Sequence, residues 1–198
     1  YQYLLDKRVL NEESDEPGGV VAVKCKSEIS HPLVNWEMSW KLARLPGLSS
    51  DSVTFLWQML HNILPTRQRL NQVTRTVQSP LCNKCEDGVQ DDLGHALLRC
   101  SYNKAVSDWM RRGLEWEHPV HEDSHILCLD VDVSGSVHGG LAYVWFLSNV
   151  LLYIFSCRKN NTPCTLYETR AKLEFGISLL RKTRYKETCR DIEAMMSR

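Results

Sequence analysis

The chain has 198 residues, of which 43% are hydrophobic and 24% are charged. This length and composition allow a substantial core in one or two domains and exclude a disordered chain. The formal net charge is zero, but residues 81–130 carry five Lys/Arg against ten Asp/Glu, and residues 157–198 carry ten against five. The basic C-terminal end is a candidate phosphate-contacting face, although charged helix faces are usually only solvated.

Cysteine usage and the chain start indicate a reducing, intracellular compartment (nucleus and/or cytoplasm). Eight cysteines would suggest disulfides in a secreted protein. Several of them are scattered without a framework spacing, namely Cys25, Cys128, Cys157 and Cys164. Residues 1–8 lack the basic start and the long apolar run of a signal peptide. Because the chain starts with Tyr1 and not Met, we expect it to be a fragment of a longer protein.

The first 30 residues predict a linker or a peripheral segment. Asn11–Gly19 is a charged run rich in turn-forming residues, and it holds no candidate for chemistry. Trp36 and Trp40 then follow four residues apart, which places them on one helix face. We interpret this pair as core aromatics rather than as a platform for stacking bases.

Two short helices are predicted before the central cysteines. Apolar residues repeat at three- and four-residue spacing over residues 53–64, and Pro65 ends this helix. Thr66 can cap a second helix that runs to about Val73, with Leu70 and Val73 facing inward. The arginines on or near the second helix are candidate phosphate contacts: Arg67, Arg69 and Arg75.

Four soft donors within nineteen residues predict a zinc site. They are Cys82, Cys85, His95 and Cys100. Cys-x-x-Cys alone is a weak signal because redox motifs share it, but an ordered His/Cys pair after a polar loop favours a metal site. His95 and Cys100 are close enough to i,i+4 spacing that one short helix can present both. Protein donors fill all four tetrahedral positions, so the predicted zinc is structural rather than catalytic.

A further helix is predicted over residues 101–110, with Val106, Trp109 and Met110 on its apolar side. The metal would then join the helical hairpin of residues 51–73 to this helix. A small domain with a limited core gains much of its folding free energy from such an ion.

These anchors together resemble a known family. Phe55-Leu56-Trp57, Leu64-Pro65-Thr66, Leu70, the four donors and Trp109 are similar to the zinc-binding domain of reverse-transcriptase polyproteins. That domain lies C-terminal to the polymerase in non-LTR (LINE-type) retrotransposons. The resemblance covers about residues 36–110 of the 198-residue chain.

The resemblance implies a nucleic-acid-associated module that catalyses nothing itself. Its implied partners are RNA or target DNA and the upstream polymerase domain of the same polyprotein, an RNA-directed DNA polymerase. Family members commonly place a Glu a few residues before the histidine, whereas Asp91 and Asp92 stand nearby in this chain. This departure leaves the four ligands themselves intact.

Residues 117–140 hold two weaker patterns. Glu117–His125 contains three histidines and three acids, but its spacing repeats no known metal site. Asp130 and Asp132 superficially resemble the carboxylates of a two-metal nuclease. Such a fold needs further acids on later strands, and the following segments predict helices, so we interpret the pair as a loop feature.

The C-terminal third predicts two packed helices. Residues 141–155 are the most apolar stretch, shorter than the ~20 residues that cross a bilayer, and therefore predict a buried core helix. A single amphipathic helix is expected over residues 165–196, packed against the first. Its basic residues are further candidate nucleic-acid contacts: Arg170, Arg181, Lys182, Arg184 and Lys186.

The sequence thus predicts a mainly α fold, a small helical Cys-Cys-His-Cys zinc-knuckle domain followed by a C-terminal helical hairpin. We divide it into a linker (1–30), a reverse-transcriptase-type zinc-binding domain (31–116) and a C-terminal helical region (117–198). The expected function is nucleic-acid binding with one structural zinc ion, with no membrane and no small-molecule substrate. The alternative is a structural or protein-interaction module that braces the polymerase, which the acidic zinc loop and the zero net charge favour. An independent hydrolase would need an open metal position, which the motif does not offer.

Overall fold

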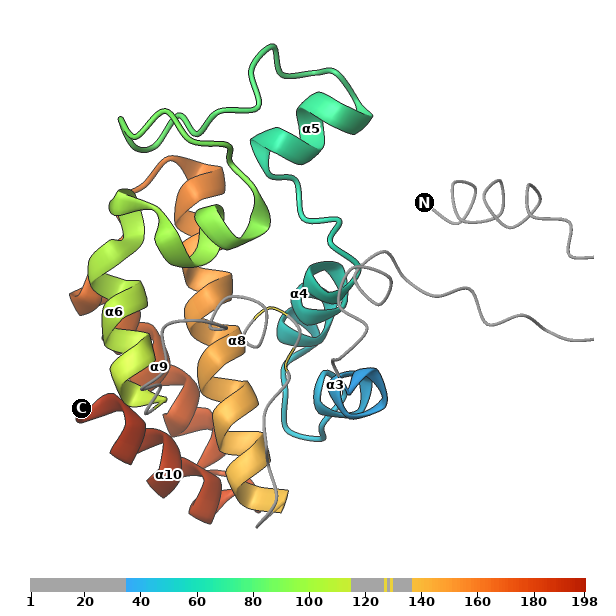
Figure 1. The fold of residues 1–198 in the computed structure, drawn as a ribbon. Helices are drawn as coiled ribbons and strands as arrows, with labels where there is room; N and C mark the ends of the chain where they lie inside the picture. Colours follow the sequence, from blue (N-terminus) through green and yellow to red (C-terminus); the bar gives the residue numbers. More distant parts are fainter. Residues whose placement is uncertain (1–34, 115–126, 128, 130–136) are drawn as a thin grey trace, which may run out of the picture.

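Helix α8 (Val137–Asn160) is the element against which most of the other helices pack (Figure 1). The structure, a computed structural model, describes residues 35–114, 127, 129 and 137–198. No strand forms among these residues, which confirms the mainly α prediction. The remaining helical elements, in chain order, are α3 (Trp36–Leu42), α4 (Ser50–Leu60), α5 (Arg67–Val73), the π-helix η1 (His95–Arg99), the 3-10 turn η2 (Ser101–Asn103), α6 (Lys104–Gly113), α9 (Leu166–Leu180) and α10 (Lys186–Met196).

Hydroxyl side chains cap the starts of α4 and α5, and the cap at Thr66 was predicted from the sequence. The Ser49 side chain accepts the backbone N–H of Ser52 at 3.1 Å, and Thr66 accepts that of Arg69 at 3.3 Å. Helix α4 ends before Pro65, where Asn62 adopts a left-handed φ of 51°. In α3 the rings of Trp36 and Trp40 lie 6.4 Å apart on one face, as expected.

Helix α5 departs from the expectation that its apolar side chains face inward. Val73 is 54% exposed, Leu70 is only half-buried, and the helix has no buried residue. The helix stands away from the bundle (Figure 1) and bonds instead to the segment that follows it. The Asn71 amide donates to the Val77 carbonyl at 2.8 Å, so polar contacts hold α5 in place of core packing.

The apolar stretch at residues 141–155 forms the middle of α8, which is longer than predicted. Side chains such as Phe146, Leu147 and Ile154 are fully buried among the neighbouring helices. The polar side chains at its centre bond back to the helix, since Ser148 and Asn149 donate to the Trp145 carbonyl at 3.2 and 2.7 Å. Within the described residues, α8 is the helix long and apolar enough to cross a membrane, but packing inside the bundle buries most of it.

One continuous core joins the family-like segment to the C-terminal helices. The ring of Trp109 in α6 meets that of Phe146 in α8 edge-on, with the ring centroids 5.4 Å apart. The ring centroids of Phe55 in α4 and Phe155 in α8 lie 6.0 Å apart. At the end of α6, a Cβ added to Gly113 would lie 2.7 Å from the Met195 carbonyl oxygen, so α6 and α10 approach closely.

The prediction of a single helix over residues 165–196 is wrong. The chain forms α9 and α10, separated by a turn over residues 181–185. At this turn the Thr183 hydroxyl donates to the Leu180 carbonyl at 2.5 Å and caps the end of α9. The reversal lets α9 bury Leu173 and Ile177 and lets α10 bury Ile192, which a straight helix of this length would carry past the bundle.

Candidate metal centre

A small hairpin presents the first two cysteines. Leu81 and Gln90 form an antiparallel bridge, and the Cys82 N–H donates to the Val89 carbonyl at 2.9 Å. Gly88 has a φ of 63°, a left-handed conformation that glycine adopts without strain, and it closes the loop. Inside the loop the backbone N–H of Lys84 lies 3.3 Å from the Cys82 sulfur. The loop therefore turns back on Cys82 and brings Cys85 beside it.

A π-helical turn presents the other two donors. The Cys100 N–H donates to the His95 carbonyl at 2.9 Å, five residues back, so η1 is a wide turn with both residues at its ends. The predicted short helix exists, but its type is π and not α. A π-turn suits the five-residue step, and such turns occur frequently at functional sites. The Asp92 carboxylate accepts the His95 N–H at 2.6 Å and fixes the start of the turn.

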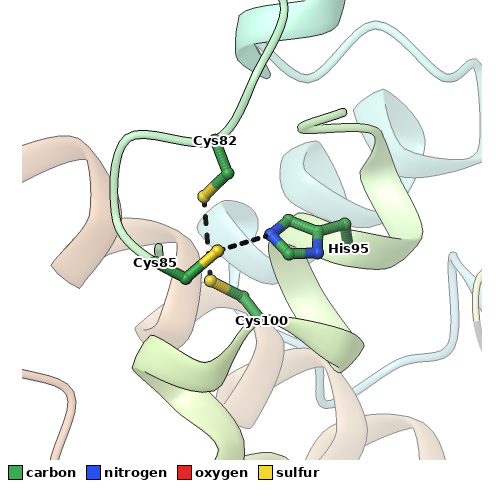
Figure 2. A group of neighbouring side chains, drawn as sticks. All are labelled: Cys82, Cys85, His95 and Cys100. Carbon is green, nitrogen blue, oxygen red and sulfur yellow. Dashed lines mark hydrogen bonds between the residues drawn. The ribbon is translucent and has the colours of Figure 1, made fainter. Parts of the chain in front are cut away.

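The four donor atoms converge on one point, with all of them within 4.8 Å of one another (Figure 2). The sulfurs of Cys82 and Cys100 are 3.8 Å apart, and the Cys85 sulfur is 3.4 Å from His95 Nε2. Zinc bonds of about 2.3 Å to sulfur and about 2.0 Å to nitrogen imply tetrahedral edges of about 3.8 Å and about 3.5 Å. These two separations match the tetrahedral edges, and all four donor atoms lie within 4.8 Å of one another, so the cluster suits one zinc ion.

The protonation behaviour of the four donors also suits a metal. Burial raises the pKa of the Cys85 thiol to about 12 and raises that of Cys100. Burial also raises the pKa of Cys82, but hydrogen bonds from Arg158 and the backbone outweigh it, and its pKa lies below the usual value. Burial lowers the pKa of His95, which keeps the imidazole neutral. Three crowded sulfurs become thiolates together only when a cation compensates them.

Two buried charges adjoin the donors, and the sequence pattern assigned neither of them to the site. Arg158, near the end of α8, donates to the Asp91 carboxylate and lies 3.5 Å from the Cys82 sulfur. Asp91 also accepts the backbone N–H of Arg67 at 3.1 Å. The sequence does show a charged residue, Arg158, soon after the most apolar stretch of the chain. Its partner Asp91 lies 67 positions away, so no local pattern joins the two.

Of the predicted phosphate contacts on or near α5, Arg67 contacts the cysteine hairpin. Arg67 donates from Nε to the Leu81 carbonyl at 2.7 Å, which ties α5 to the cysteine loop. Arg69 is half-buried, and Arg75 is exposed with a left-handed φ of 53°. The structure therefore gives Arg67 a structural contact and leaves Arg75 open to solvent.

The C-terminal candidates also divide into residues with contacts inside the protein and residues that are open to solvent. The Arg170 guanidinium lies 5.3 Å from the Trp109 ring centroid, and Arg181 pairs with Glu193. The others lie on the exposed turn between α9 and α10 and at the start of α10, namely Lys182, Arg184 and Lys186. This turn and α5 lie at opposite ends of the molecule (Figure 1).

Three features of the sequence analysis lie outside the described residues. They are the predicted linker of residues 1–30, the histidine-rich run Glu117–His125 and the pair Asp130 and Asp132. Within the part of the chain that the structure describes, the group able to hold a metal is the four-donor cluster.

A helical fold with three cysteines and one histidine closed around a single point defines a zinc-stabilised protein module, with no position left for a substrate or water. A comparison with protein families adds that residues 24–107 match the family described as zinc-binding in reverse transcriptase. This match contains all four donors and ends within α6, so α8, α9 and α10 lie beyond it. No curated protein and no solved structure matches the chain.

Proposed function

We propose that this chain is a non-catalytic, zinc-stabilised nucleic-acid-binding module of a reverse-transcriptase polyprotein from a non-LTR (LINE-type) retrotransposon. In that polyprotein it lies C-terminal to the polymerase domain. The observation that carries the proposal is the convergence of Cys82, Cys85, His95 and Cys100 inside the segment that matches the reverse-transcriptase zinc-binding family.

The metal in this module is structural. The four side chains would hold the ion, which supplies a cross-link between the hairpin at Cys82 and the π-turn at Cys100. Because the hairpin also contacts α5 and α8 through Arg67 and Arg158, the centre fixes the relative positions of these helices. The reaction chemistry of the parent protein belongs to other domains.

The exposed basic turn between α9 and α10 is the better candidate for phosphate contact. Lys182, Arg184 and Lys186 lie within five residues, and all are exposed. Arg67 of α5 donates to the cysteine hairpin, and the loop of that hairpin carries the acidic residues Glu86 and Asp87, which oppose an approaching phosphate. Each phosphate contact should make binding weaker as the salt concentration rises.

A fluorescence titration with labelled single-stranded RNA and duplex DNA at two salt concentrations tests the proposal. We expect binding at low salt that weakens steeply at higher salt. Replacing Lys182, Arg184 and Lys186 by Gln should weaken binding and lower the salt slope, and replacing Arg69 and Arg75 should have a smaller effect. The absence of binding at low salt would overturn the proposal.

The second candidate function is a module that braces the polymerase by protein contact. Exposed apolar side chains on α9 favour it, since Tyr167 is 83% exposed, Phe175 is 67% exposed and Leu179 is 49% exposed. Under this alternative, replacing Tyr167 and Phe175 by Ser would weaken association with the polymerase domain of the parent protein. The same replacement would leave nucleic-acid binding unchanged.

A further inference from the structure

We propose that Arg158 is part of the zinc centre, as the residue that donates to its thiolates and sets its zinc affinity. Arg158 lies on α8, beyond the matched segment of residues 24–107. The inference does not depend on nucleic-acid binding. It concerns how the C-terminal helices complete the metal site.

The position of the guanidinium carries the proposal. Its Nη2 lies 3.5 Å from the Cys82 sulfur and also donates to the Asp91 carboxylate. Both charged side chains are buried, with 7% of the Arg158 side chain and 5% of the Asp91 side chain exposed. Its Nη1 is buried without a hydrogen-bond partner in the described part of the chain. The guanidinium therefore keeps donor capacity beyond its bonds to Cys82 and Asp91.

The charge balance of the site gives this arrangement a function. One Zn²⁺ with three thiolates and a neutral imidazole carries a net charge of −1, and Asp91 adds another negative charge. An uncompensated buried charge is strongly unfavourable, and Arg158 supplies a permanent positive charge beside both groups. Without Arg158, the buried site would hold two negative charges close together, so the thiolates would bind zinc less well.

Two more contacts hold the residues that follow α8, one to the cysteine hairpin and one to η2. Lys84 donates to the side chain of Asn161, and the Tyr102 hydroxyl donates to the Thr162 carbonyl. Asn161 has a left-handed φ of 56°, and the Thr162 N–H donates to the Cys157 carbonyl at 3.0 Å. These bonds fix the last turn of α8, so the Arg158 side chain is delivered to the sulfurs in one orientation.

Competition of the full chain with a colorimetric zinc chelator tests the proposal. Arg158→Met keeps the approximate volume of the side chain and removes every donor. Loss of an outer partner of a metal ligand typically weakens metal binding by about 10- to 100-fold, and we expect this range for Arg158→Met. The matched control is Lys159→Gln, which removes the neighbouring exposed charge on the same helix. Zinc affinity of Arg158→Met within about twofold of that control would overturn the proposal, since the outer-partner effect would be missing.

A double variant separates thiolate contact from simple pairing with Asp91. Asp91→Asn with Arg158→Met removes both partners of the buried ion pair, so neither Asp91 nor Arg158 is left as an unpaired buried charge. Zinc affinity that stays at least about tenfold below that of Asp91→Asn supports the proposal, because the donor to the sulfurs is still missing. Recovery to the affinity of Asp91→Asn would show that Arg158 serves Asp91 alone, and would overturn it.

Cobalt substitution supplies a readout that a purely structural role would not move. A hydrogen bond to a thiolate lowers the energy of the sulfur lone pairs. The thiolate-to-cobalt charge-transfer band of Arg158→Met should therefore shift to longer wavelength than that of Lys159→Gln. An unshifted band would contradict the proposal.

Discussion

At the scale of single residues, Asn103 holds the wide turn that carries two of the metal donors. Its amide donates to the Leu97 carbonyl at 3.0 Å and to the Ser107 hydroxyl at 2.8 Å, and the side chain is 1% exposed. A π-turn leaves carbonyls outside the ordinary helical pattern, so the Leu97 carbonyl relies on side-chain donors, the Asn103 amide at 3.0 Å and the more distant Ser107 hydroxyl at 3.3 Å.

Replacing Asn103 by Ala should lower the free energy of unfolding by about 1–3 kcal/mol, because the buried Leu97 carbonyl loses its amide donor. Urea denaturation of the zinc-loaded protein measures this change. The matched control is Asn160→Ala, which removes an exposed amide at the end of α8. A loss no larger than that of the control would contradict the role given to Asn103.

At the scale of elements, the close approach of α6 to α10 depends on Gly113. An ideal Cβ at this position would meet the backbone oxygen of Met195 at 2.7 Å, and backbone cannot move aside as a flexible side chain can. The short C-terminal helix therefore packs at a distance that only glycine permits.

Replacing Gly113 by Ala should destabilise the protein by about 1–3 kcal/mol through this clash. The sign of this change in stability is informative, because replacing Gly by Ala within a helix ordinarily stabilises a protein by roughly 0.5–1 kcal/mol. Thermal unfolding followed by circular dichroism measures the change. An increase in the melting temperature would show that α10 does not pack against Gly113.

The sequence predicted correctly the elements that neighbouring residues decide, and it did not predict the features that depend on distant contacts. The sequence predicted the cap at Thr66 and the apolar run of α8 correctly, because neighbouring residues decide them. The break between α9 and α10 was missed, because continuous amphipathic spacing runs through a turn that packing against the bundle requires. The exposure of Val73 was missed because α5 is held by polar bonds and not by a core.

At the scale of the whole molecule, the metal centre also combines residues that a local pattern predicts with residues that only distant contacts bring together. Its four donors lie within nineteen residues and were predicted correctly as one cluster, because their spacing alone encodes a site. Asp91 and Arg158 are 67 positions apart and meet only through the packing of α8 on the cysteine hairpin. No local pattern encodes such a pair.

Removing the metal should therefore loosen the end of α8 as well as the cysteine hairpin. A ligand that binds only the folded state stabilises it by about 2.7 kcal/mol when its free concentration is 100 times the dissociation constant. We expect chelation to remove a stabilisation of this size. Hydrogen exchange should quicken at Cys157–Asn160 together with residues 82–100, because Arg158 joins the two segments. Unchanged exchange at the end of α8 would show that it is independent of the centre.

Metal analysis of the purified chain and of two cysteine variants tests the central claim most directly. Cys100→Ser removes one of the four converging donors, whereas Cys189→Ser removes a buried cysteine on α10 that lies outside the cluster. The structure predicts one zinc ion per chain in the unmodified protein and in Cys189→Ser, and loss of tightly bound zinc in Cys100→Ser. Full zinc content in Cys100→Ser, or a folded chain that takes up no zinc, would contradict it.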